Sequence, residues 1–253
     1  MEFFVHKDSV VRKIWGKGDT ILFIFSGAAA EFALNKAVDW LYFTGRLPAD
    51  PLGRLFSTVA YARKIVFSEY NAALQAIDMI TAIHKNVESA RSAQIPDWAY
   101  RDVLFMLIDY SIRSFELLER KLTPEEKNET FDVFYRVGVR MGLTGLPMNY
   151  DEWLIMRKEH LKQDLVHSHY TKDLFLQYKK HLGPVRYMLL KQGQVLVVPE
   201  KIKELLSLGN IHWLSPVLMA YKASRLIKLN DVLRDAILPK KYKHQIKDLD
   251  VVI

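Results

Sequence analysis

The sequence contains no cysteine among its 253 residues. This absence excludes disulfides, thiolate-ligated haem, iron–sulfur clusters and cysteine nucleophiles, so any metal must be held by histidine, by carboxylates or through a cofactor. The chain also lacks a long apolar run: the one at residues 20–30 ends at Glu31, far short of the ~20 residues that a membrane-spanning helix needs. The N-terminus lacks the apolar region of a secretory signal. These absences predict a cytoplasmic protein.

Several motifs of common enzyme and binding classes are missing as well. We find no glycine-rich phosphate loop, no Gly-x-Ser-x-Gly nucleophile elbow, no His-Glu-x-x-His helix and no aromatic RNA-binding signature. The net charge is +7, which is too dispersed to predict nucleic-acid binding. Basic residues concentrate only between residues 222 and 247. That stretch is interpreted as a solvated helix face, with peripheral contact to an anionic membrane surface as the alternative.

What is present indicates a helical protein with a large core. Half of the residues are apolar and 12% are aromatic, which excludes disorder. Capping residues and apolar spacing predict one all-α domain over residues 1–253. We expect helices at residues 20–43, 51–67, 69–89, 98–121, 124–141, 151–166, 171–182, 199–208 and 216–237. The only strand-like run is Gln194-Val195-Leu196-Val197-Val198.

One histidine and one polar helix face stand out within this pattern. His84 lies two turns after Ile77, in the apolar stripe of its helix. A lone histidine there is either a hydrogen-bonded core residue or a ligand, and neutral imidazole is the commonest nitrogen ligand of haem iron. On the preceding helix Arg54, Ser57 and Thr58 share one face by their spacing. That face suits either a surface salt bridge or the floor of a pocket that stabilises bound oxygen or an anion.

At this point the chain resembles the catalytic domain shared by latex-clearing rubber oxygenases and the fungal mycophenolate-pathway oxygenase MpaB. The resemblance extends from about residue 10 to residue 245. Its motifs are Ile14-Trp15-Gly16-Lys17-Gly18-Asp19, Asp50-Pro51-Leu52-Gly53-Arg54-Leu55-Phe56-Ser57-Thr58, Val66-Phe67, Ile83-His84-Lys85-Asn86-Val87, Asp109-Tyr110-Ser111, Leu122-Thr123-Pro124-Glu125-Glu126, Arg136-Val137-Gly138 and Ala236-Ile237-Leu238-Pro239.

The resemblance implies an all-α bundle, globin-like in its helix density, that encloses a b-type haem. His84 matches the proximal iron ligand, and Arg54 and Thr58 match the distal arginine and threonine. Dioxygen would then oxidise or cleave carbon–carbon double bonds of an isoprenoid or other lipid-like apolar substrate. Asp109 is one candidate acceptor for the second N–H of the His84 ring, with a backbone carbonyl as the alternative.

The chain departs from the family pattern in three places. Ser57 replaces the distal lysine, and serine cannot ligate iron as an amine can. The first long helix carries Phe25-Ser26-Gly27-Ala28 in place of a Gln-Leu-Ala-His-Pro run, and a histidine common before Asp109 is missing. These departures leave open a non-catalytic haem- or lipid-binding protein, a haem peroxidase or peroxygenase, and a cofactor-free adaptor at a membrane surface.

A second group of histidines follows in the sequence. His160, His167 and His169 lie close together, but polar residues flank them. We interpret this group as a solvated segment in preference to a metal site.

Overall fold

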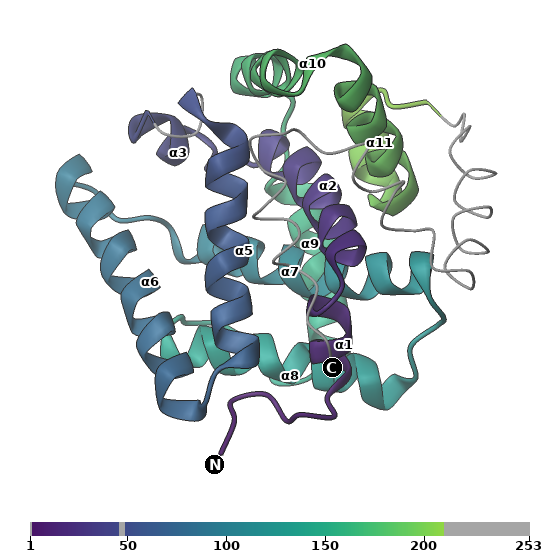
Figure 1. The fold of residues 1–253 in the computed structure, drawn as a ribbon. Helices are drawn as coiled ribbons and strands as arrows, with labels where there is room; N and C mark the ends of the chain where they lie inside the picture. The colour runs from purple at the N-terminus through teal and green to yellow at the C-terminus, as the bar shows by residue number, and fades with distance from the viewer. Residues whose placement is uncertain (1, 46–48, 210–253) are drawn as a thin grey trace.

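The computed structural model describes residues 2–45 and 49–209. Within them the protein is helical and contains no strand beyond two isolated bridges, which confirms the all-α fold. Figure 1 shows how the helices are arranged. They are α1 (Val10–Trp15), α2 (Gly18–Leu34), α3 (Asp39–Phe43), α5 (Pro51–Phe67), α6 (Tyr70–Arg91), α7 (Asp97–Leu118), α8 (Pro124–Arg140), α9 (Tyr150–Gln163), α10 (His169–Val197) and α11 (Glu200–Leu206). The basic helix expected after residue 215 lies outside the described residues.

The predicted helix starts of α5 and α8 are confirmed by their capping bonds. The carboxylate of Asp50 accepts a hydrogen bond from Gly53 N at 3.0 Å, and Pro51 opens α5. A Cβ on Gly53 would lie 2.4 Å from Asp50 Oδ2, so a larger residue there would require the capping carboxylate to shift. Thr123 and Glu126 form a reciprocal capping box at the start of α8. Such caps satisfy backbone donors that have no partner within the helix.

The single helix expected at residues 20–43 is wrong, because α2 ends at Leu34 and α3 begins only at Asp39. Asn35 stops α2 with an extended backbone, at ψ 134°. Its side-chain oxygen accepts a hydrogen bond from Ala37 N at 2.8 Å. Asparagine side chains compete with the helix for backbone groups in this way.

The strand-like run Gln194–Val198 is also corrected, because it forms the end of α10 up to Val197. Gln194, Val195 and Val197 are all buried there. Burial on several sides of the chain, and not an alternating sheet face, explains the concentration of valine. The predicted stop at Gly183 is confirmed as a kink, since this glycine has φ 75° and divides α10 into two limbs.

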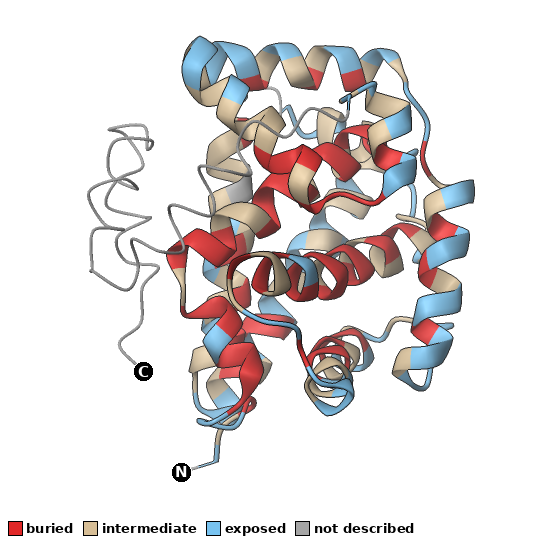
Figure 2. Cartoon of the chain, turned by 90° about the vertical axis from the view of Figure 1, so that its right-hand side faces the viewer, coloured by how far each residue is buried: buried red, intermediate tan, exposed pale blue. Residues whose placement is uncertain are grey.

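Helix α2 lies at the centre of the core and packs on both α7 and α10. Gly27 permits the contact with α7, because a Cβ there would lie 2.3 Å from the ring of Tyr110. Near the start of the domain the indole N–H of Trp15 donates to Ser111 Oγ of α7 at 3.1 Å. Figure 2 shows the buried residues along the inner faces of these helices. The core is therefore centred on α2, and buried residues of α1, α5, α6, α7 and α8 belong to the same hydrophobic cluster.

Helices α5 and α6 form an antiparallel pair at one side of this core. They meet near Phe67 and Tyr70, and Figure 1 shows them diverging toward Pro51 and Arg91. The buried residues of α6 are Ala73, Ala76 and Ile77, all in its first half. The second half of α6, which carries His84, is therefore less completely covered by protein. Within the described residues, no helix combines the length and apolarity required to cross a membrane.

Candidate functional site

The polar face predicted on α5 is assembled in the structure. Arg54 Nη1 donates to Thr58 Oγ1 at 2.7 Å and to Ser57 Oγ at 3.3 Å. Ser57 Oγ donates in turn to the carbonyl of Arg54 at 2.7 Å. These bonds hold the guanidinium along its own helix. The spacing i, i+3 and i+4 places the three side chains on one face, as the sequence predicted.

His84 lies on α6 with its ring half-buried. Its Nδ1 atom is buried and has no hydrogen-bond partner among the described residues. The ring lies edge-on to Tyr100 of α7, with centroids 5.1 Å apart. A buried polar atom without a partner is uncommon in proteins and calls for an explanation. One explanation is a ligand or acceptor that the protein atoms themselves do not supply.

The charge state of His84 links it to the α5 face. Burial and, to a smaller extent, the positive charge of Arg54 lower the pKa of His84 to about 4, although Glu88 partly opposes both effects. The imidazole is therefore neutral at pH 7 and carries a lone pair that can coordinate a metal. Arg54 of α5 is therefore near enough to His84 of α6 for its charge to act on the ring, although no described residue of α5 lines the pocket beside His84.

A pocket of about 320 Å³ borders His84. Its lining residues come from α6, from α7 and its preceding loop, and from the segment after α8: Thr81, Lys85, Glu88, Gln94, Ile95, Asp97, Tyr100, Met141, Gly142 and Leu143. Glu88 organises this wall, because its Oε1 accepts from Ile95 N at 2.9 Å and from the Tyr100 hydroxyl at 3.1 Å. Sequence reasoning missed both Glu88 and Tyr100. The only available signal was that Glu88 follows His84 by one helical turn.

Asp109, a candidate acceptor for the His84 ring, is buried, but the structure places it in a different cluster. One carboxylate oxygen accepts from Arg113 Nε at 2.6 Å and the other from Arg157 Nε at 3.0 Å. Arg157 also pairs with Glu31, and the hydroxyl of Tyr110 donates to Glu31 at 2.7 Å. Both Asp109 oxygens are thus occupied by arginines. The structure does not bring Asp109 to the His84 ring.

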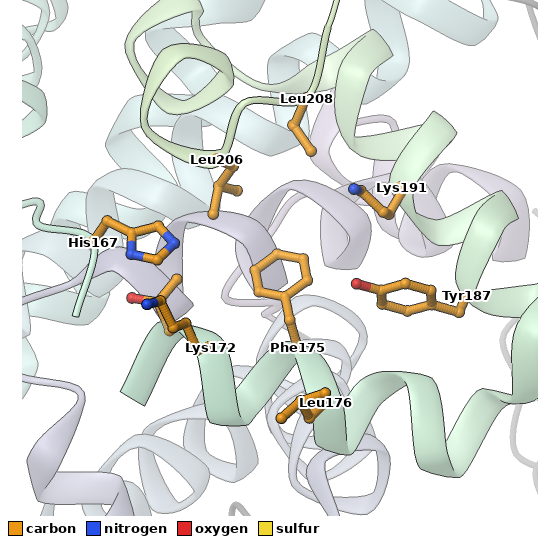
Figure 3. Close-up of a pocket in the computed structure, with 9 residues that line it drawn as sticks. His167, Lys172, Phe175, Leu176, Tyr187, Lys191, Leu206 and Leu208 are labelled. Atoms are coloured by element: carbon orange, nitrogen blue, oxygen red, sulfur yellow. The ribbon is translucent and has the colours of Figure 1, made fainter. Parts of the chain in front are cut away.

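A second pocket, of about 410 Å³, lies between the two limbs of α10 and α11. Figure 3 shows Phe175 at its centre, with Lys191 and Tyr187 on one side and His167 and Lys172 on the other. None of its lining residues comes from α5 or α6. This pocket is therefore separate from the site around His84.

One comparison with known proteins returns a match for the chain. Searches of curated proteins and of solved structures find no match for the chain. The sequence model of one family does match, over residues 13–226, and this span contains Arg54, Ser57, Thr58 and His84. The family is described as ER-bound oxygenase mpaB/B'/rubber oxygenase, catalytic domain. Because the match covers most of the chain, the protein belongs to this family of oxygenase catalytic domains.

Proposed function

We propose that this protein is a haem b-dependent oxygenase that uses dioxygen to oxidise or cleave carbon–carbon double bonds of an apolar, isoprenoid-like substrate. The observation that carries the proposal is the buried Nδ1 of His84, which has no hydrogen-bond partner in the described part of the chain and whose ring is within reach of the charge of Arg54 on α5. Membership of an oxygenase family gives that neutral imidazole a specific use. Imidazole is the usual axial ligand of b-type haem in proteins that handle oxygen.

The residues around His84 suit a haem in two further respects. Met79 and Ile83, which precede His84 closely on α6, are 48% and 40% exposed, although both side chains are large and apolar. An apolar macrocycle or substrate against α6 would cover such side chains. The hydroxyl of Tyr61 on α5 contacts Met79 Sδ at 3.5 Å, so this surface faces the α5 helix.

In this proposal His84 holds the iron, and bound haem supplies the activation of dioxygen. Arg54 contributes a positive charge and N–H donors, while the 2.7 Å bond to Thr58 keeps the guanidinium in place. Fixed donors of this kind stabilise negative charge that develops on oxygen during reaction. Ser57 supports Arg54 but supplies no amine, so it cannot close the distal side as the lysine of rubber oxygenases does.

The decisive experiment measures haem in the purified full-length chain and in His84→Ala. Wild-type protein should carry one haem by the pyridine haemochrome assay, and His84→Ala should lose it or show a shifted Soret band. His181→Ala, which removes an exposed histidine of α10, is the matched control and should retain the wild-type spectrum. Stoichiometric haem with an unchanged Soret band in His84→Ala would overturn the ligand assignment.

A turnover assay distinguishes the oxygenase from a peroxygenase and from a non-catalytic haem carrier. The reduced protein is exposed to air with a prenyl-chain substrate, and aldehyde or ketone products are measured. Oxygen-dependent products support the oxygenase. Products that require added peroxide but no oxygen indicate a peroxygenase, and haem binding without products indicates a non-catalytic carrier.

A further inference from the structure

Helix α7 carries two buried aspartates two turns apart, and only one of them is neutralised. Asp109 is paired with Arg113 and Arg157. Asp102 is 2% exposed, and among the described residues its side-chain oxygens hydrogen-bond with Asn35 Nδ2, at 2.7 Å, and with His160 Nδ1. In the part of the chain that the structure describes, no lysine or arginine forms an ion pair with Asp102. Buried carboxylates are normally paired with a cation or ligate a metal.

His160 and Asp164 complete a cluster around Asp102. His160 is buried, which corrects the expectation that it lies in a solvated segment. Asp164, the residue that ends α9, places its Oδ2 3.7 Å from His160 Nδ1. One donor atom from each of the three side chains lies within 4.8 Å of the others. Donors that share one ion at about 2 Å lie roughly 3–4 Å apart, so little movement would bring them into coordination.

The geometry of the cluster favours a ligand role for His160. Its Nδ1 atom is the ring nitrogen that faces both carboxylates, contacting Asp102 Oδ1 and lying 3.7 Å from Asp164 Oδ2. The cluster therefore brings one nitrogen donor and two carboxyl groups together in a largely buried setting.

The surrounding backbone holds the three donors in place. Asn35 donates to the Asp102 oxygen that faces away from His160, and Ala37 N donates to the Asn35 amide oxygen. Lys36 N donates to the carbonyl of Asp164 at 2.9 Å, which fixes the end of α9 against the end of α2. Ligating carboxylates are commonly oriented by such outer hydrogen bonds.

We propose that Asp102, His160 and Asp164 bind one divalent transition-metal ion, of the Zn²⁺ or Mn²⁺ class, that ties α7 to the end of α9. One imidazole nitrogen with two carboxylate oxygens suits these ions better than Ca²⁺ or Mg²⁺, which take oxygen ligands. The ion neutralises Asp102 as the arginines neutralise Asp109. This site shares no residue with the pocket at His84.

The test uses the full-length chain after chelator treatment and desalting. Zn²⁺ is titrated in competition with a chromophoric indicator, and Mn²⁺ binding is followed by electron paramagnetic resonance. We expect one equivalent of bound metal and a rise in the thermal unfolding midpoint, because an ion that binds only the folded state stabilises it. His160→Gln should abolish binding, and Asp164→Asn should weaken it by at least about tenfold.

Two matched variants control for adventitious surface binding. Glu159→Gln and His167→Gln alter exposed neighbours outside the cluster and should bind metal as the wild type does. If His160→Gln fails to fold, Asp164→Asn decides, because that carboxylate lies nearer the surface. Absence of metal binding by the wild type, or equal binding by the wild type and Asp164→Asn, would overturn the proposal.

Discussion

The ring of Tyr100 lies edge-on against His84, with an interplanar angle of 77°, while its hydroxyl donates to Glu88 on the same helix as the histidine. Helix α7 therefore contacts α6 twice at this point, once through a ring edge and once through a hydrogen bond. Edge-on aromatic contacts fix ring orientation as well as adding stability. Tyr100 thus determines how the His84 imidazole is presented.

Substitutions at Tyr100 should separate these two contacts. Tyr100→Phe keeps the ring and loses the hydroxyl, so we expect a loss of about 1 kcal/mol in the free energy of unfolding. Tyr100→Ala also removes the support of His84 and should weaken haem binding, which Tyr100→Phe leaves unchanged. Urea denaturation and hemin titration of both variants provide the measurement. Equal haem affinity in Tyr100→Ala and the wild type would show that the ring does not orient His84.

The depressed pKa of His84 predicts a pH dependence of folding stability for the haem-free protein. The pKa is about 4 in the folded state and about 6.5 in an unfolded chain, so between these values the unfolded state binds more protons. Stability is therefore unaffected above pH 6.5 and falls as the pH drops toward 4. The slope reaches at most about 1.4 kcal/mol per pH unit.

Urea denaturation between pH 7.5 and pH 4.5 tests this dependence. His160 also has a lowered pKa and adds a slope of the same sign. The comparison is therefore made with His84→Gln, which removes one titrating group and leaves the others. The stability of this variant should fall less steeply than that of the wild type. Parallel curves for the two proteins would contradict the low pKa of His84.

Removing the charge of Arg54 should raise the pKa of His84. Arg54→Met eliminates the nearby positive charge that disfavours the imidazolium, whereas Arg54→Lys retains it. Nuclear magnetic resonance titration of the imidazole should show an upward shift in Arg54→Met only. If the proposed function holds, oxygenase turnover should also fall by about 10²–10³-fold in Arg54→Met. An unchanged His84 titration would show that α5 does not act on the ring.

Arg157 of α9 pairs with both Glu31 of α2 and Asp109 of α7, so removing it should lower the stability of the fold strongly. Arg157→Met leaves Glu31 and Asp109 buried without their shared partner, and we expect a loss of about 3–5 kcal/mol in the free energy of unfolding. Arg113→Met removes a largely exposed partner of Asp109 and should cost about 1 kcal/mol or less. Chemical denaturation measures the free energy of unfolding of both variants. Equal losses of stability in Arg157→Met and Arg113→Met would contradict this prediction.

Structural features that depend only on residues within a single helix could be predicted from the sequence. The Asp50 and Thr123 caps, and the shared face of Arg54, Ser57 and Thr58, depend on spacings of three or four residues. Such spacings have a fixed geometric meaning once a segment is helical. The helical register also placed His84 near the interior, although the structure leaves its half of α6 only partly covered.

Features that depend on contacts between helices could not be predicted in this way. Asp109 was a candidate partner of the His84 ring, but its partner Arg157 comes from α9, and no local spacing connects the two positions. The same holds for Tyr100 at His84 and for Asp102 at His160. The break after Leu34 arose because a single asparagine side chain captured the backbone where the apolar pattern continued.

The close contact between Gly27 and Tyr110 implies a constraint on how this sequence can diverge. Any side chain at position 27 would collide with the tyrosine ring, and a smaller residue at position 110 would leave a hole facing the glycine. The tyrosine hydroxyl also donates a hydrogen bond to Glu31 of α2 at 2.7 Å. We therefore expect these two positions to covary among related sequences, with loss of the glycine accompanied by loss of the aromatic ring.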